Sequence, residues 1–106
     1  MPKGIMYVES RPKSPEDEAA YHEWYNERHL SEISAIDGVV AARRYAPLDN
    51  TGSYIAIYEL DADDLDAVRS RLTESLRSGE MSPPVGVQTS PPPTTLYYRE
   101  IASHVP

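Results

Sequence analysis

The chain has 106 residues, of which 40% are hydrophobic and 25% are charged, a composition typical of one globular domain. Its formal net charge of −7 argues against a nucleic-acid partner and an anionic membrane partner, because both attract basic surfaces. Cysteine is absent, which excludes disulfides, thiolate nucleophiles and cysteine-ligated metal sites. No stretch approaches the ~18 apolar residues of a membrane span and no signal peptide is visible, so we expect a cytoplasmic protein.

The hydrophobic pattern and the turn residues predict six elements in the order β-α-β-β-α-β. Ser14 is predicted to cap the first helix, with Pro15 at its first position. Asp61 is predicted to cap the second helix, which Gly79 ends. Five of the ten prolines fall in residues 80–94, so we expect an irregular and mobile loop there. The predicted strands are residues 4–10, 39–46, 53–60 and 95–102, and the first helix is predicted to run to about residue 35.

This order is the ferredoxin-like βαββαβ motif, an α+β fold with an antiparallel four-stranded sheet in a single domain over residues 1–106. Two helices cover only one face of such a sheet, yet apolar residues occur on both faces of the strands. In the first strand Ile5 and Tyr7 lie on one face, and Met6 and Val8 lie on the other. We therefore expect a homodimer in which a second copy covers the sheet face. The alternative is a monomer whose tyrosines are half-exposed to water.

The segment at residues 21–30 reads Tyr-His-Glu-Trp-Tyr-Asn-Glu-Arg-His-Leu, with Ile-Asp-Gly-Val-Val at 36–40 and Arg-Arg-Tyr at 43–45. This pattern resembles the EthD-like family of the dimeric α/β barrel superfamily, whose first helix carries an aromatic-Tyr/Trp-x-x-x-His motif. Tyr25 and His29 fall on the motif positions. The resemblance implies a dimeric α/β barrel. It leaves the reaction open, because the superfamily includes cofactor-free cyclases and isomerases, quinone-forming monooxygenases and haem-handling enzymes.

Tyrosine and histidine share one face of the first predicted helix. At about 100° per residue, Tyr25 and His29 lie in an arc that also holds apolar residues, as in the wall of a cavity. An imidazole exchanges protons near neutral pH, so His29 is the candidate acid/base and Tyr25 a candidate donor to an enolate oxygen. Alternatively, both are core residues with satisfied hydrogen bonds. The candidate substrate-binding residues are His22, Tyr21, Ile33, Tyr54 and Tyr58.

Arg43 and Arg44 point to opposite faces of the second predicted strand. One of them is expected to anchor a carboxylate or to pair with Glu59, and strand alternation does not decide which. No metal site is predicted, because His22 and His29 are seven residues apart rather than four. No cofactor-binding motif occurs either.

These features favour a cofactor-independent enzyme of the cyclase, isomerase or lyase type, acting on a small hydrophobic oxygenated molecule in the barrel cavity. The first alternative is a non-catalytic protein that binds such a molecule. The second is a haem-handling or quinone-forming monooxygenase, which is disfavoured because the second helix carries no clear histidine to ligate iron.

Overall fold

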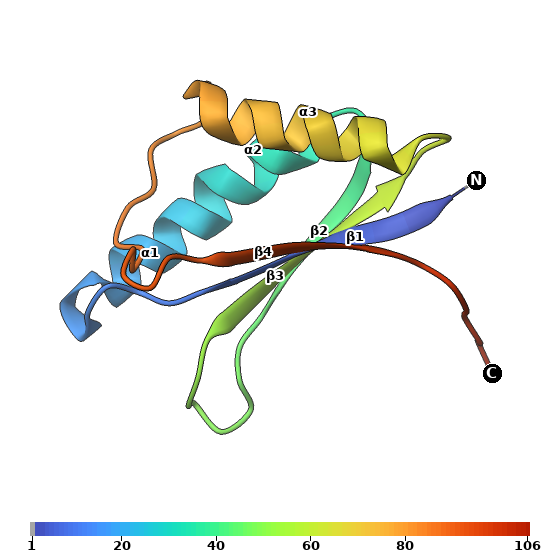
Figure 1. Ribbon diagram of the computed structural model, residues 1–106. Coiled ribbons are helices and arrows are strands. Elements are labelled where there is room, and N and C mark those ends of the chain that lie inside the picture. The colour runs from blue at the N-terminus through green and yellow to red at the C-terminus, as the bar shows by residue number, and fades with distance from the viewer. Residues whose placement is uncertain (1) are drawn as a thin grey trace.

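The chain folds into one antiparallel sheet with its helices packed on a single face (Figure 1). The computed structural model describes residues 2–106. The predicted α+β, ferredoxin-like fold is confirmed, with the strand order β2-β3-β1-β4. The strands are β1 (Lys3–Ser10), β2 (Val39–Tyr45), β3 (Tyr54–Asp61) and β4 (Thr94–Arg99).

The helical segment between β1 and β2 changes its helix type along its length. Ser14 stands at the N-cap position in an extended conformation and Pro15 takes the first position, as predicted. The Ser14 side chain makes no capping hydrogen bond to the backbone, however, and donates to the Asp17 carboxylate at 2.6 Å instead. The sequence predicts a regular helix, but five residues form a π-helical turn. The wider turn lets the consecutive residues Trp24 and Tyr25 both face inward, where they are 6% and 4% exposed. The parts are η1 (Pro15–Asp17, a 3₁₀ turn), α1 (Glu18–Trp24), η2 (Tyr25–His29, the π turn) and α2 (Leu30–Ser34).

The second helix, α3 (Leu65–Ser78), begins later than the sequence predicts. Asp64 caps it, because its side chain accepts a hydrogen bond from the Ala67 backbone N–H at 3.2 Å. The predicted cap Asp61 still belongs to β3, and its N–H donates to the Gly38 carbonyl at 2.9 Å. The prediction of Asp61 as the cap was therefore wrong. Gly79 ends the helix as predicted, in the left-handed conformation with φ of 80°.

The hydrophobic core lies between these helices and the inner face of the sheet. Met6 of β1 stands at the centre of that face, opposite Tyr58 on one neighbouring strand and Tyr97 on the other. The apolar face of α3 closes the core from above. The most completely buried large side chains are Tyr21, Tyr58, Met6, Ile33, Leu72 and Val68.

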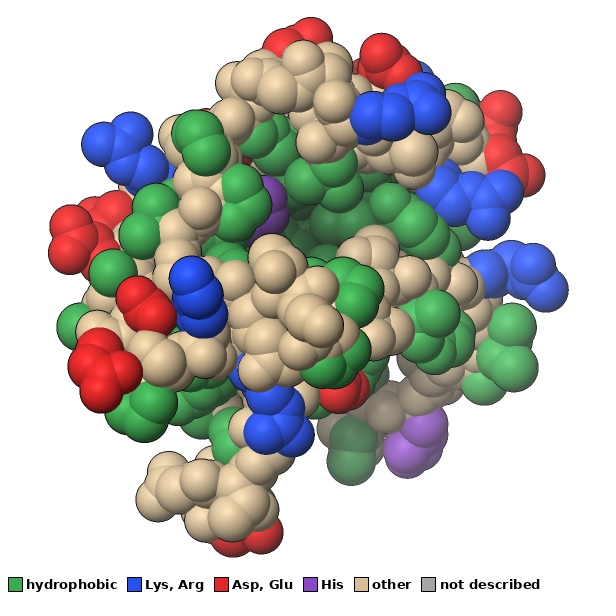
Figure 2. All heavy atoms as spheres, turned by 60° about the vertical axis from the view of Figure 1, so that its left-hand side comes forward, with side chains coloured by type: hydrophobic (Ala, Val, Ile, Leu, Met, Phe, Trp, Pro, Cys, Tyr) green, Lys and Arg blue, Asp and Glu red, His purple; other side chains and the backbone are tan. Residues whose placement is uncertain are grey.

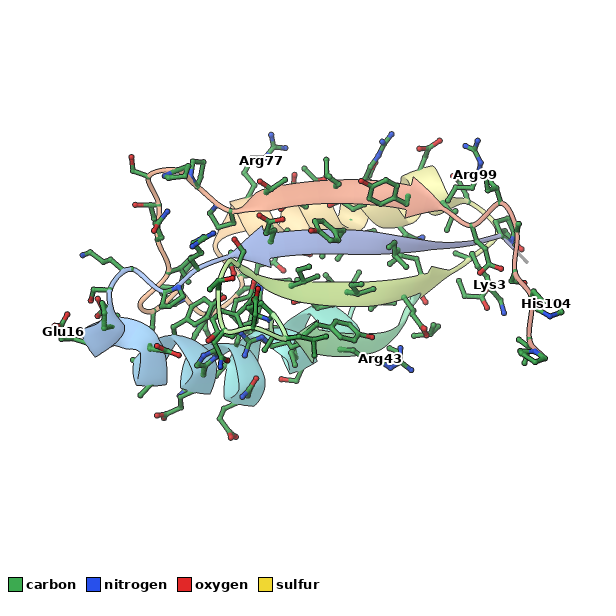
Figure 3. The ribbon with its side chains drawn as sticks, turned by 90° about the horizontal axis from the view of Figure 1, so that it is seen from below. Lys3, Glu16, Arg43, Arg77, Arg99 and His104 are labelled. Atoms are coloured by element: carbon green, nitrogen blue, oxygen red, sulfur yellow. The ribbon has the colours of Figure 1, made fainter. Side chains whose placement is uncertain are left out.

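The outer face of the sheet has no helix over it within residues 2–106, and Figure 3 looks onto this face. The predicted alternation of β1 is confirmed, because Ile5 and Tyr7 lie on the outer face while Met6 is in the core. Leu96 and Tyr98 extend the apolar outer face across β4, where they are 42% and 52% exposed. The face is thus rich in hydrophobic side chains that the fold itself does not cover.

Residues 80–93 form an irregular connection, as predicted, but it is anchored to the chain that follows β1. The Lys13 N–H donates to the Gly86 carbonyl at 2.7 Å, and the Gln88 N–H donates to the Arg11 carbonyl at 2.9 Å. The last strand ends at Arg99, three residues before its predicted end, and an exposed tail carrying His104 follows it (Figure 3). Within the described chain, no helix has the length and apolar character needed to cross a membrane.

Candidate functional site

The two adjacent arginines of β2 lie on opposite faces of the sheet. Arg43 lies on the outer face, where its guanidinium is 2.9 Å from a Glu59 carboxylate oxygen. Arg44 lies on the inner face, beneath α1 and η2. The structure therefore assigns to Arg43 the ion pair with Glu59 and leaves Arg44 for the interior.

Three tyrosine rings surround the Arg44 guanidinium. Its Cζ atom is 4.4 Å from the ring centroid of Tyr25, 5.3 Å from that of Tyr21 and 5.8 Å from that of Tyr54. At these distances the negative faces of the rings attract the cation. We call Arg44 and these three tyrosines the arginine–tyrosine cluster.

Only one nitrogen of the Arg44 guanidinium has hydrogen-bond partners among residues 2–106. Nη1 donates to the Asn26 side-chain oxygen at 2.9 Å and lies 3.2 Å from His22 Nδ1. Nε and Nη2 are buried and have no partner in the described chain, and neither has the buried hydroxyl of Tyr58. Burial also raises the pKa of Tyr58, so its hydroxyl is a neutral donor. Buried polar atoms are usually paired, so these three atoms mark the cluster as a candidate site.

The remaining polar groups around the cluster do have partners. The hydroxyls of Tyr21 and Ser10 are 2.7 Å apart. Tyr54 donates to Glu18 at 3.1 Å, which raises the pKa of the Tyr54 hydroxyl. The same carboxylate oxygen lies 3.7 Å from His22 Nε2. Glu18 therefore ties two of the predicted substrate-binding residues to the rim of the cluster.

His29 lies on the other side of Tyr25. Its imidazole stacks on the Trp24 ring at 4.3 Å and meets the Tyr25 ring edge-on at 5.3 Å. Its side chain is 12% exposed, and burial lowers the pKa of His29 to about 4, although the Glu32 carboxylate opposes this. The imidazole is therefore neutral at pH 7.

The connection after α3 covers His29 and its surroundings. Glu32 accepts hydrogen bonds from the Ser82 backbone N–H at 2.8 Å and from the Ser82 hydroxyl at 2.9 Å, which lower the pKa of Glu32. The other Glu32 oxygen is 3.9 Å from His29 Nδ1. These two atoms and Trp24 Nε1 are buried, with no hydrogen-bond partner in the described part of the chain.

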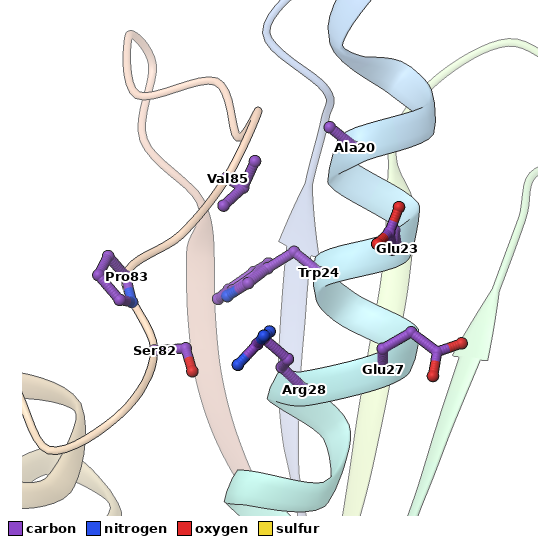
Figure 4. A pocket seen from close by; sticks show the side chains of 8 residues that line it. All are labelled: Ala20, Glu23, Trp24, Glu27, Arg28, Ser82, Pro83 and Val85. Atoms are coloured by element: carbon purple, nitrogen blue, oxygen red, sulfur yellow. The ribbon is translucent and has the colours of Figure 1, made fainter.

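A cleft of about 380 Å³ opens beside Trp24, between the first helical segment and the connection after α3. In Figure 4 the Trp24 ring and the Arg28 side chain extend from the helix toward Ser82 and Pro83. This side of the molecule is hollowed, and hydrophobic side chains and a histidine line the hollow (Figure 2). The residues around the cleft are Ala20, Glu23, Trp24, Glu27, Arg28, Ser82, Pro83 and Val85.

Six of the seven predicted site residues are near one another. Tyr25 is central, because its ring contacts both Arg44 and His29. Burial raises the pKa of Tyr25, so its hydroxyl is protonated at neutral pH. Ile33, the seventh, is buried in the same hydrophobic core as Tyr21, Tyr25 and Tyr58 but lies further along the helical segment, in α2. The six residues on or beside the cluster are Tyr21, His22, Tyr25, His29, Tyr54 and Tyr58.

Sequence reasoning left Arg44 undecided and missed Asn26 and Glu32. Strand alternation fails for Arg44 because the pairing of β2 with β3 shifts between Val39 and Ala41, which reverses the faces of the residues that follow. Trp24, which was not among the candidate residues, lines the cleft. The bulge between Val39 and Ala41 is the feature that sets the face of Arg44, and no pattern in the sequence predicts it.

Comparison with known proteins finds similarity in the fold. No family model matches the chain, and no curated protein matches it. Rv0793 from Mycobacterium tuberculosis is similar in structure, with 20% identity and a TM-score of 0.47, over 91% of this chain and 93% of that one. A putative monooxygenase from Shewanella loihica PV-4 is similar with 19% identity and a TM-score of 0.51, over 97% of this chain and 99% of that one. At this level of identity, the similarity to the Shewanella loihica structure supports the fold and carries no information on the reaction.

Proposed function

We propose that this chain is an EthD-like enzyme that needs no cofactor and acts on a small hydrophobic molecule carrying oxygen. The substrate is bound between the first helical segment and the inner face of the sheet. The motif residues Tyr25 and His29 support the family relationship, and the similarity of fold is compatible with it. The reaction type is proton transfer at a carbon beside a carbonyl group, as in isomerases and cyclases.

One observation carries this proposal: a buried, neutral imidazole lies beside a buried phenol that in turn contacts a guanidinium. The His29 ring is 5.3 Å from the Tyr25 ring, and Arg44 Cζ is 4.4 Å from the Tyr25 ring. A neutral imidazole is the protonation state that a general base requires. A protonated phenol and a cation are the groups that stabilise a developing oxyanion.

The proposed step balances without an oxidant or a reductant. His29 removes a proton from the carbon next to the carbonyl, and the electron pair of that C–H bond moves to the carbonyl oxygen. The Tyr25 hydroxyl donates a hydrogen bond to the resulting enolate oxygen. Protonated His29 then returns the proton to another carbon of the same molecule, which gives an isomer. Alternatively, the enolate carbon attacks a second carbonyl of the same molecule, which closes a ring, and protonated His29 gives its proton to the alkoxide oxygen that forms there.

We also propose that the enzyme is a homodimer formed through the outer face of the sheet. The exposure of Leu96 and Tyr98 on that face supports this assembly, because monomers seldom leave broad apolar surfaces in water. A second copy of the same sheet is the partner with a matching surface. The proposal concerns the outer face only and does not change the inner site.

Hydrogen–deuterium exchange into an enolisable ketone tests the chemistry without knowledge of the natural substrate. Acetophenone in D₂O exchanges its methyl protons when a base forms the enolate, and ¹H NMR follows the loss of the methyl signal. We expect the protein to accelerate this exchange and the variants H29A and Y25F to lose the acceleration. The variant H104A is the matched control, because His104 lies in the exposed tail.

The same experiment separates catalysis from simple binding. If acetophenone perturbs the NMR signals of the protein but its methyl protons exchange no faster than in buffer, the chain is a binding protein. If H29A exchanges as fast as the wild type, the assignment of His29 as the base is wrong. A Soret band in the absorbance of the purified protein would instead favour the haem-handling alternative.

A further inference from the structure

We infer that the molecule bound here carries a carboxylate, and that the Nε–Nη2 edge of Arg44 binds it with the Tyr58 hydroxyl alongside. This inference rests on the proposed function for the location of the site and adds the class of substrate. It comes from the buried polar atoms that no group of residues 2–106 satisfies. The natural substrate is then a small organic acid with a hydrophobic part.

The Nε–Nη2 edge of Arg44 is the edge of a guanidinium that can form bidentate hydrogen bonds to a carboxylate. Nη1 is used by Asn26 at 2.9 Å, whereas Nε and Nη2 have no partner within residues 2–106. The N–H bonds of Nε and Nη2 are nearly parallel, and their spacing matches the two oxygens of a carboxylate. The contact with Asn26 and the stacked tyrosine ring hold this fork in place before any ligand arrives.

The charge of Arg44 also lacks a counter-ion. In the described chain no carboxylate lies within ion-pair distance of Arg44. Glu18 contacts Tyr54 and His22, and Glu59 pairs with Arg43 on the opposite face. Tyrosine rings attract a cation but do not neutralise it, and the buried Nε and Nη2 atoms have exchanged their water partners for none within residues 2–106, which is costly. An anionic ligand would supply the missing partner.

Tyr58 adds a third donor from the neighbouring strand. It is 0% exposed, and its hydroxyl has no hydrogen-bond partner among residues 2–106. Tyr58 lies opposite Ala42, two residues before Arg44 on β2, so both side chains are on the inner face. Tyr58 thus supplies a neutral donor on the same face of the sheet as the guanidinium, and a carboxylate oxygen accepts several hydrogen bonds.

The site favours a carboxylate over a phosphate. One guanidinium and one phenol offer donors with a single positive charge, whereas phosphate sites usually gather several cations or backbone N–H groups. The surrounding tyrosine rings favour a flat apolar group next to the anion. Benzoate therefore serves as a probe, and benzamide is its uncharged counterpart of nearly the same shape.

The test is an NMR and calorimetric titration of the full chain with benzoate, benzamide and inorganic phosphate. We expect benzoate to shift the Nε–H signal of Arg44 and to bind about tenfold or more tightly than benzamide. The variant R44Q should lose this preference, and Y58F should weaken benzoate binding severalfold. R43Q is the matched control, because Arg43 is the adjacent residue on the opposite face and should leave benzoate binding unchanged.

Three results would overturn the inference: no shift of the Arg44 Nε–H signal with benzoate, equal affinity for benzoate and benzamide, or tighter binding of phosphate. All three are measured on the wild type, so they decide the matter even if R44Q does not fold. H29A separates this inference from the proposed catalysis. It should bind benzoate like the wild type while losing the acceleration of acetophenone exchange, so each proposal can fail without the other.

Discussion

The two faces of the sheet carry similar side chains in different surroundings. The inner face holds Arg44 and Tyr58, and the outer face holds Arg43 and Tyr7. On the outer face the polar groups have partners, because Arg43 pairs with Glu59 at 2.9 Å and Tyr7 donates to Glu9 at 2.9 Å. On the inner face, the two nitrogens of the Arg44 fork and the Tyr58 hydroxyl have no partner in the described chain.

This difference separates two kinds of surface within one small fold. On the inner face, the helices exclude water from the Arg44 fork and the Tyr58 hydroxyl, which have no partner among residues 2–106. We therefore propose that this face binds a polar molecule. On the outer face, Arg43 and Tyr7 have hydrogen-bond or ion-pair partners, and apolar side chains meet water. We therefore propose that this face associates with another apolar surface. A substitution on one face can therefore be compared with a matched substitution on the other face or at an exposed position.

The largest expected effect is loss of the dimer in Ile57→Arg. Ile57 lies on the outer face opposite Tyr7, and a charge there would be buried without a partner in the assembly. We expect the dimer to weaken about 100-fold or more. Sedimentation equilibrium measures this, with Ser70→Arg on the exposed surface of α3 as the control. A folded wild-type monomer near 11.9 kDa at micromolar concentration would contradict the assembly itself.

The next effect compares Met6 with Ile5, two adjacent residues on opposite faces of β1. Met6 is 1% exposed in the core, so Met6→Ala should reduce the free energy of unfolding by about 2–5 kcal/mol. Ile5→Ala should cost about 1 kcal/mol or less when the outer face is open to water. Urea denaturation of both variants in the Ile57→Arg background measures the difference. Equal losses would mean that the two faces are equally buried in the single chain.

Acid should destabilise the protein through His29. The pKa of His29 is about 4 in the folded state, below the ordinary value of 6.5. Between these values the unfolded chain binds a proton that the folded chain does not, so stability falls as the pH falls from about 6.5 to 4. The loss from this group is roughly 3 kcal/mol. Denaturation at several pH values should show a smaller decline in H29Q, and an unchanged decline in the control H104Q.

The smallest effect compares two tyrosines that lose their hydroxyls. Tyr58→Phe removes a buried hydroxyl that has no partner within residues 2–106, so we expect the free energy of unfolding to rise by about 1 kcal/mol. Tyr7→Phe removes a half-buried hydrogen bond to Glu9 and should change it by about 0.5 kcal/mol or less. Thermal denaturation distinguishes the two. A marked loss of stability in Tyr58→Phe would show that its hydroxyl is satisfied in the folded protein.

The fold was predictable from the sequence because its signals are local. The alternation of Met6 with Ile5 and the stop at Gly79 follow from strand geometry and from backbone conformation. The details that were missed depend on tertiary contacts. The pairing shift after Val39 decides the face of Arg44, and the π turn separates His29 from His22. No local sequence pattern predicts either feature. Most of the candidate residues could therefore be named from the sequence, but not which of them lie together in the structure.

The most direct measurement is a map of where a small ligand contacts the protein. Acetophenone can be titrated into ¹⁵N-labelled protein, in which Trp24 is the single tryptophan and gives one indole N–H signal. If the inner face is the binding site, the Trp24 indole signal and the backbone signals of residues 21–29 shift, while those of residues 5–7 and 55–57 change little. Shifts centred on the strand residues Ile5, Tyr7 and Ile57, with the Trp24 signal unchanged, would place the ligand on the outer face and contradict the account.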